Sequence, residues 1–217
     1  MNGYIKVLVI GALANNVYQY ALDKLNLFGF SFTHFLMMFY AYPVYLLMNF
    51  SGYCDIVIGS AKLSGFNLPE NFNNPYLARN TVDFWNRWHI SLSEWIRDYI
   101  YQPVFKFLIS GIMKNSIVLA QYLSIFFTFL IAGLWHGTSI NFIIFGLLQG
   151  IGMVLSLWYK DYIKKKLGKE KFKQYNKSNI AAATEIIVYF HYTCVSFIFI
   201  ELDVNILINK FKLFFNF

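Results

Sequence analysis

Mostly apolar runs, each close to 20 residues long, limit what this chain can fold into more than any other feature. Three are clear, at residues 116–135, 140–159 and 180–200, and a fourth covers residues 32–50. A helix of roughly 20 mostly apolar residues matches the thickness of the hydrocarbon core of a bilayer. Backbone polar groups in lipid must bond within their own segment, so such runs predict helices that cross a membrane.

Two weaker runs complete the predicted set of spans. Residues 3–22 are apolar but contain Asn15 and Asn16, and the stretch from Gly52 is a candidate for a short or tilted sixth span. Composition agrees, because 58% of the 217 residues are apolar and only 13% are charged, against about 45–50% and about 25% in soluble domains. The predicted fold class is all-α, a polytopic integral membrane protein with a single domain over residues 1–217.

The positive charge is concentrated between two of these runs. Eight of the 18 basic residues lie in KDYIKKKLGKEKFKQYNK, residues 160–177, which is typical of a cytoplasmic loop. The net charge of +7 therefore indicates no nucleic acid partner; the lipid bilayer is the expected neighbour. The chain changes membrane side at each span. Residues 67–115 are therefore also expected to face the cytoplasm, and the turn at residues 135–139 is expected to face the outer side.

A different pattern fills residues 84–101, FWNRWHISLSEWIRDYIY, which are aromatic and charged. Asn80 or Thr81 can cap a helix that begins near Val82. Apolar side chains then recur every three or four residues, at Phe84, Trp88, Leu92, Trp95 and Tyr99. The pattern predicts one amphipathic helix lying in the membrane interface.

Charged side chains on the polar flank of this helix have the spacing of ion pairs. Asp83 and Arg87 are four residues apart, and Glu94 and Arg97 are three apart. Residues at these spacings are neighbours on a helix surface. We therefore expect two ion pairs along it.

Four histidines are the candidates for chemistry: His34, His89, His136 and His191. None has a second histidine or cysteine three or four residues away, so no metal site is predicted. His136 lies in AGLWHGTS, between Gly133 and Gly137, where the chain turns between two spans. An ionisable group at membrane depth is a functional candidate, and imidazole can exchange a proton near neutral pH.

Two long stretches resemble a known family. They are SGYCDIVIGSAKLSGFNLPENFNNPYLARNTVDFWNRWHISLSEWIRDYIYQP, residues 51–103, and GLWHGTSINFIIFGLLQG, residues 133–150. Together they are similar to the membrane-bound O-acyltransferase (MBOAT) family, in its bacterial polysaccharide branch, which includes alginate O-acetylation and teichoic acid D-alanyl transfer proteins. Members are typically about twice as long, so the chain resembles a C-terminal half that lacks N-terminal helices.

The resemblance implies a ring of helices around a tunnel and assigns two site residues. His136 matches the catalytic histidine of the family. His89 matches a second signature position, held by His in this branch and often by Asn elsewhere. The topology above places His89 toward the cytoplasm and His136 toward the outer half, joined by one pathway.

The implied reaction moves an acyl group, with acetyl favoured, from a cytoplasmic thioester to hydroxyls of an extracytoplasmic polysaccharide or to a partner protein. The donor is acyl-CoA or an acyl-phosphopantetheine carrier, and no bound cofactor is expected. His136 would act as general base, with an N–H of Trp135 or Asn141 stabilising the oxyanion. Arg87 and Arg97 either hold the donor's phosphates or form structural salt bridges.

Other readings of the sequence stay open. GYCDIVIG, with Asp55 as a further candidate for substrate binding, looks closer to the acetylating members than to the D-alanyl ones. D-alanyl transfer from a carrier protein to teichoic acid is the alternative within the family. An inactive truncated fragment and a transporter that relays protons through histidines are the alternatives outside it. The expected location is the bacterial cell membrane.

Overall fold

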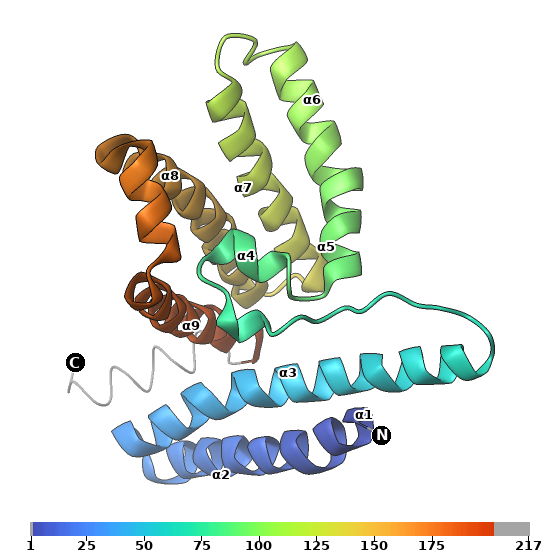
Figure 1. Ribbon diagram of the computed structural model, residues 1–217. Helices are drawn as coiled ribbons and strands as arrows, with labels where there is room; N and C mark the ends of the chain where they lie inside the picture. The colour runs from blue at the N-terminus through green and yellow to red at the C-terminus, as the bar shows by residue number, and fades with distance from the viewer. Residues whose placement is uncertain (1, 202–217) are drawn as a thin grey trace. The chain divides into compact units, whose positions relative to one another are not determined.

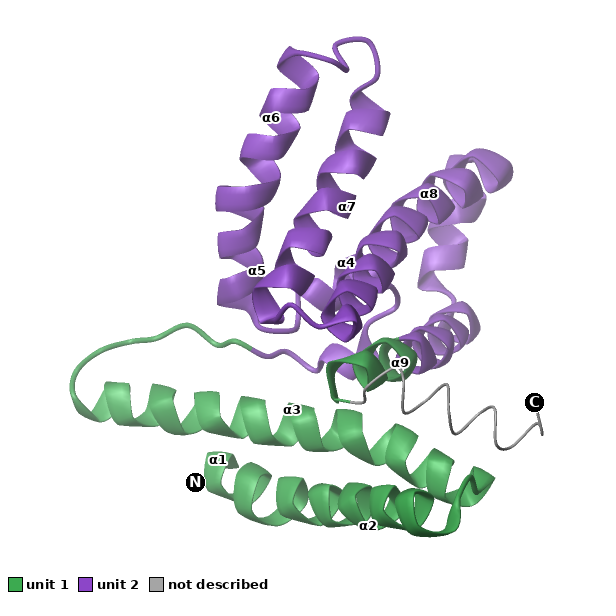
Figure 2. Ribbon diagram, turned by 180° about the vertical axis from the view of Figure 1, so that it is seen from behind, with its two compact units in different colours: residues 1–71, 193–217 green, residues 72–192 purple. Residues whose placement is uncertain are grey.

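The computed structural model describes residues 2–201, whose regular structure is helical apart from an isolated antiparallel bridge. The single-domain prediction extends to residue 217, so its last part lies outside the described residues. Contacts divide the chain into two compact units (Figure 2). Unit 1 combines residues 1–71 with 193–217, and unit 2 is residues 72–192.

Four helices within residues 2–201 are long and apolar enough to cross a membrane. They are α3 (Phe32–Leu63), α7 (Ile117–His136), α8 (Ile140–Lys177) and α9 (Asn179–Glu201) (Figure 1). These helices coincide with the three clear apolar runs and with the fourth. The all-α, polytopic fold class is thereby confirmed.

The predicted sixth span is wrong as a separate element, because α3 continues through it. Nothing between Phe50 and Leu63 interrupts the helix, which ends just before Gly65 at a φ of 85°. Pro43 lies inside α3 and is buried, a position that membrane helices tolerate when neighbouring groups satisfy the freed carbonyl.

Unit 1 pairs α3 with an N-terminal helical run. The run consists of α1 (Asn2–Ile5), the π-helical turn η1 (Lys6–Gly11) and α2 (Ala12–Phe28), and it lies alongside α3 (Figure 1). The backbones approach closely, since a Cβ on Gly3 would lie 2.6 Å from the carbonyl oxygen of Gly52. The predicted weak span at residues 3–22 is thus helical, although divided among these three elements.

Unit 2 is organised around the α7–α8 hairpin. A second helical run consists of α5 (Ile90–Ile96), the π-helical turn η3 (Arg97–Tyr101) and α6 (Gln102–Ser110), and it packs antiparallel against α7 (Figures 1 and 2). The start of α5 and the end of α7 therefore lie at the same end of the hairpin. His89 precedes α5 and His136 ends α7, so the predicted separation of the two histidines toward opposite sides is wrong.

The predicted amphipathic helix from Val82 is interrupted. The 3-10 turn η2 (Pro75–Leu77) leads into the short helix α4 (Thr81–Trp85), which stops before His89. Asn80 caps α4 as expected, accepting the N–H of Asp83 at 3.0 Å. Phe84 and Trp88 are buried, whereas Trp95 and Tyr99 beyond the break are 52% and 68% exposed. The five apolar side chains therefore do not share one face.

The basic segment at residues 160–177 is helical rather than an irregular loop. It continues α8, and the helix kinks at Gly168, whose φ is 74°. A left-handed backbone at this point is easily adopted only by a residue without a Cβ. The kink redirects the last turns of α8 toward α9.

Candidate active site

His89 lies at an unusual backbone position. Its φ of 44° and ψ of 57° are left-handed, a conformation that costs free energy for residues other than glycine and that Asn, Asp and His adopt most often among them. Its carbonyl accepts the N–H of Ser93 at 3.0 Å, which starts α5. The imidazole stacks on Phe72, with ring centroids 6.5 Å apart and planes inclined by 24°.

A buried aromatic cluster holds the chain in this conformation. Phe84 is 0% exposed and stacks on Trp88, with ring centroids 5.5 Å apart. Phe72 and Trp88 meet edge to face, with ring centroids 5.1 Å apart, and form the antiparallel bridge. Ser93 Oγ donates to the Trp88 carbonyl at 3.1 Å. The backbone on both sides of His89 is therefore tied to packed side chains, which compensate for its strain.

Polar contacts also stabilise the segment that precedes His89. The carboxylate of Asp83 accepts the Arg79 N–H at 3.0 Å and forms an ion pair with Arg87 Nε at 2.7 Å. Asn73 donates its N–H to the Arg87 carbonyl at 2.9 Å. The first predicted ion pair is confirmed, and Arg87 has a structural role in this arrangement.

Arg97 is placed differently from the prediction. It pairs with the adjacent Asp98 at 2.9 Å, not with Glu94 as expected, and both partners of the pair are more than half exposed. Arg97 also lines a cavity of about 350 Å³, together with Glu94 and Tyr101. Arg97 is therefore exposed beside this cavity, whereas Arg87 is paired with Asp83.

His136 ends α7 among aromatic rings. Its imidazole lies 4.9 Å from the ring of Trp135, 6.0 Å from Phe142 and 5.9 Å from Phe145, measured between centroids. His136 is nevertheless exposed, so the ring is not sealed within packed side chains. The site thus combines an accessible imidazole with an apolar surround.

Small residues bring α7 and α8 together just before His136. A Cβ on Gly133 would collide with the carbonyl oxygen of Phe142 and lie 3.0 Å from Gly146 Cα. A Cβ on Gly146 would lie 2.6 Å from the carbonyl oxygen of Phe129. Such close backbone approach is how helices associate in membranes. It fixes where α7 presents His136.

The two candidates for the oxyanion donor differ in exposure. Trp135 is 68% exposed, whereas Asn141 is 7% exposed in the first turn of α8. The Asn141 backbone N–H donates to Ser139 Oγ at 3.4 Å. The Trp135 indole is therefore the more accessible N–H beside His136.

Sequence reasoning missed a buried polar contact between α4 and α8. Trp85 Nε1 donates to Gln149 Oε1 at 3.1 Å, and Gln149 is 0% exposed. The signal available in the sequence was an amide inside an apolar run, since a polar group in a span must find a partner within the protein. This contact anchors the segment that carries His89 onto the hairpin that carries His136.

The structure brings the two signature histidines within electrostatic range of each other. Burial lowers the pKa of the His89 imidazole below its ordinary value of 6.5, and the charge of His136 lowers that pKa further. Asp55 belongs to unit 1, where its carboxylate lies 2.8 Å from Lys6 Nζ. The candidate site in unit 2 is therefore built on His89 and His136. Within residues 2–201, no three His, Cys, Asp or Glu side chains cluster in a way that could hold a metal ion.

The lowered pKa of His89 predicts a pH-dependent stability. The unfolded chain takes up this proton near pH 6.5, whereas the folded chain takes it up only at a lower pH. Protonation thus favours the unfolded state, so the contribution of His89 is fully present above pH 6.5 and falls as the pH drops below it. Thermal unfolding midpoints measured from pH 7.5 to 5.0 should decline.

The matched variant is His89→Asn, because asparagine tolerates a left-handed backbone. It should show a shallower decline than the parent, whereas His191→Asn, an exchange at an exposed histidine, should keep the parent's decline. An unchanged slope in His89→Asn would contradict the assignment.

Comparison with known proteins identifies a matching family and several relatives of this chain. A match to the membrane-bound O-acyltransferase family covers residues 6–200. The chain is 33% identical over 163 residues to a teichoic acid D-alanyltransferase of Bacillus subtilis, a match that covers 75% of this chain and 40% of the relative. It is 38% identical over 163 residues to a peptidoglycan O-acetyltransferase of Helicobacter pylori, covering 75% of this chain and 29% of the relative.

A third relative is a probable alginate O-acetylase, AlgI, of Pseudomonas fluorescens. It is 41% identical over 115 residues, which are 53% of this chain and 22% of the relative. The chain therefore spans less than half the length of each of these relatives.

Proposed function

This chain belongs to the membrane-bound O-acyltransferase family, and from that membership we propose that it transfers an acetyl group from a cytoplasmic thioester to hydroxyls of an extracytoplasmic polysaccharide or to a partner protein. The observation that carries the proposal is the location of an accessible His136 and of His89 at the same end of the α7–α8 hairpin. Acetyl is favoured because the chain is 38% identical to the peptidoglycan O-acetyltransferase and 33% identical to the D-alanyltransferase.

The chemistry requires a base beside the acceptor. A hydroxyl is a weak nucleophile until its proton is removed, and neutral His136 is the proposed acceptor of that proton. The hydroxyl oxygen attacks the thioester carbonyl, the C–S bond breaks, and the proton passes to the departing sulfur. The products are an oxygen ester and a free thiol. His89 lies within electrostatic range of His136 and is proposed to support its orientation and charge.

The other candidate residues divide between two roles. The indole N–H of Trp135 is the proposed donor to the oxyanion, with Asn141 as the buried alternative. Arg97 is the proposed contact for the phosphates of coenzyme A or of a phosphopantetheine arm, because it is exposed beside the cavity of about 350 Å³. Arg87 is committed to Asp83 and is assigned no donor contact.

Orientation follows from the charge on α8. The basic residues 160–177 lie at the end of α8 remote from His136, and positive segments favour the cytoplasmic side. About 20 apolar residues of α8 separate the two ends, roughly 30 Å of helix. The donor thiol ester therefore has to reach His136 through the protein, as in the tunnel expected from the family, and the proposed location is the bacterial cell membrane.

The test measures which ester the protein makes. The gene is deleted and restored in its own host, and hydroxylamine-labile acetyl and D-alanyl groups on cell-envelope polymers are quantified by NMR. Acetyl esters that disappear with the gene and return with it are the expected result. Loss of D-alanyl esters alone would replace acetyl by the alternative within the family. Unchanged esters of both kinds would overturn the acyltransferase proposal in favour of an inactive fragment or a proton-relaying transporter.

A further inference from the structure

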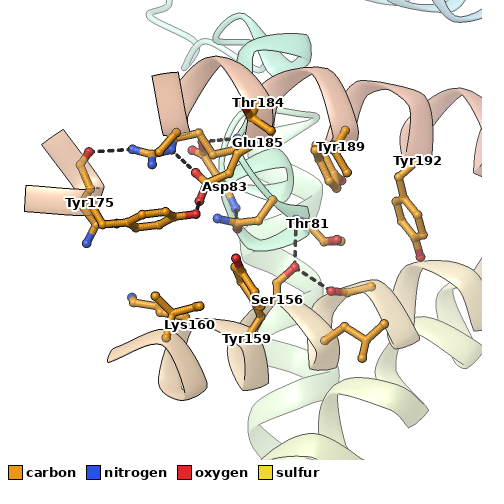
Figure 3. Close-up of a pocket in the computed structure, with 18 of the residues that line it drawn as sticks. Thr81, Asp83, Ser156, Tyr159, Lys160, Tyr175, Thr184, Glu185, Tyr189 and Tyr192 are labelled. Atoms are coloured by element: carbon orange, nitrogen blue, oxygen red, sulfur yellow. Dashed lines mark hydrogen bonds and ion pairs between the residues drawn. The ribbon is translucent and has the colours of Figure 1, made fainter. Parts of the chain in front are cut away.

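A second cavity in unit 2, of about 810 Å³, is lined by neither His89 nor His136. It lies between α8 and the first half of α9, and the loop before α4 closes one side (Figure 3). Its apolar lining includes Leu155, Ile163, Phe172 and Val188. The cavity is therefore separate from the proposed acyl-transfer site.

One end of this cavity is polar, and most of its groups are paired with one another, although Arg79 Nη2 is buried without a hydrogen-bond partner. Arg79 Nε lies 2.5 Å from Glu185 Oε2, and the Tyr175 hydroxyl donates to Glu185 Oε1 at 2.5 Å (Figure 3). Arg79 Nη1 also donates to the Asn176 carbonyl at 3.0 Å. The kink at Gly168 makes this possible, because it turns the last part of α8 back toward α9.

The cavity opens through an apolar rim. Leu155 on α8 is 52% exposed and Val188 on α9 is 64% exposed, and both side chains line the cavity. Both helices are candidate membrane spans. Aliphatic side chains exposed on spanning helices are compatible with contact to hydrocarbon, so we infer that the cavity opens toward the bilayer.

The depth of the opening is marked by aromatic side chains. Trp158 and Tyr162 stack on each other, with ring centroids 5.5 Å apart, and are 51% and 44% exposed. Tryptophan and tyrosine in such positions mark the boundary between hydrocarbon and headgroups. Lys160 lies between them in sequence and lines the cavity. The part of the lining at Lys160 is therefore at headgroup depth on the basic side, whereas Leu155 lies more than one helical turn nearer the membrane centre.

Charge indicates what kind of headgroup fits there. The two acidic side chains that line the cavity have cationic partners, Glu185 with Arg79 and Asp83 with Arg87. Lys160, by contrast, makes no ion pair with any residue that the structure describes. Its ammonium group is available to an external anion.

We propose that this cavity binds one anionic phospholipid from the leaflet on the basic side. An acyl chain enters between Leu155 and Val188, and the phosphate lies at Lys160. An apolar space that opens into lipid fills with acyl chains, because an empty space forfeits dispersion contacts along its whole lining. Basic pockets between membrane helices on this side are suited to anionic headgroups.

The experiment uses the full protein in nanodiscs of phosphatidylcholine with a minor fraction of phosphatidylglycerol, and native mass spectrometry counts the lipids that remain bound. The parent should retain one phosphatidylglycerol in preference to phosphatidylcholine. Lys160→Gln should lower its retention about fivefold, the effect of one lysine near a membrane surface. Lys173→Gln removes the same charge from the same basic segment but outside the cavity lining, and should leave retention unchanged.

A second pair of variants tests the acyl-chain site. Ala181→Phe places a ring in the cavity lining and should abolish retention of both lipids, whereas Ala183→Phe, at an exposed position outside the lining, should not. Circular dichroism and elution volume verify folding of all four variants. Equal losses in Lys160→Gln and Lys173→Gln, full retention in folded Ala181→Phe, or no preference for phosphatidylglycerol in the parent would each overturn the proposal.

Discussion

Replacing His136 with alanine is expected to lower ester formation by about 10²–10⁴-fold, the range that a positioned general base contributes. The protein should still accumulate in the membrane, because His136 is exposed and lies at the end of α7. The measurement is the amount of polymer-bound ester per unit of membrane-inserted protein.

The control for this variant is a histidine in a comparable setting. His191 is exposed on α9, and its Nδ1 lies 2.7 Å from the Ile187 carbonyl oxygen. His191→Ala should leave ester formation unchanged. If His136→Ala forms as much ester as the parent at equal protein levels, His136 is not the base.

The second large effect is expected from Gly133→Ala. The added methyl group would meet the Phe142 carbonyl oxygen and Gly146 Cα, which are backbone atoms and cannot rotate away. The α7–α8 hairpin must then separate, and overpacking of this kind costs about 1–3 kcal/mol or more. His136 follows less than one turn later, so ester formation should fall together with stability. Unfolding in a mixed-micelle SDS titration measures the first effect.

Gly59→Ala is the matched exchange. It lies within α3, and a Cβ there would meet no atom within 4 Å. Alanine is the better helix former by about 1 kcal/mol, so stability should hold or rise. Equal stability of Gly133→Ala and the parent would show that the hairpin does not depend on this close approach.

The spans were predictable because they follow from length and composition alone. An apolar run bounded by polar residues has one stable conformation in lipid, so α7 begins and ends within one residue of its predicted limits. The cap of α4 by Asn80 was equally local and equally predictable. The continuation of α3 past Gly52 was harder to predict. A glycine in the sequence can mark either a break between helices or a close approach of two helices, and only the structure shows that Gly52 lies against Gly3.

The break at His89 could not be predicted, because it depends on contacts across the fold. Periodicity favoured one continuous helix, but Trp88 packs between Phe72 and Phe84, and this packing outweighs the local helical preference. Helical spacing also misplaced the partner of Arg97. The turn η3 is π-helical, and its wider winding changes which side chains are neighbours.

The candidate site was partly visible in the sequence. His89 and His136 were identified by motif and residue type, and the Asp83–Arg87 pair was correctly expected from its spacing. The larger cavity was not visible, because Arg79 and Glu185 are 106 residues apart. No periodic sequence pattern relates positions so far apart. Their neighbourhood depends on the kink at Gly168, which turns the end of α8 toward α9.

The helical form of the basic segment affects how the sidedness of this protein can be mapped. Residues 160–177 offer trypsin eight lysines, which would ordinarily make the segment a sensitive reporter of the face that it occupies. A protease needs an extended backbone, however, and here the lysines lie on α8 and are released only by local unfolding. Resistance to digestion would therefore measure the stability of these helical turns, and labelling of the lysine amines is the more direct probe of which face they occupy.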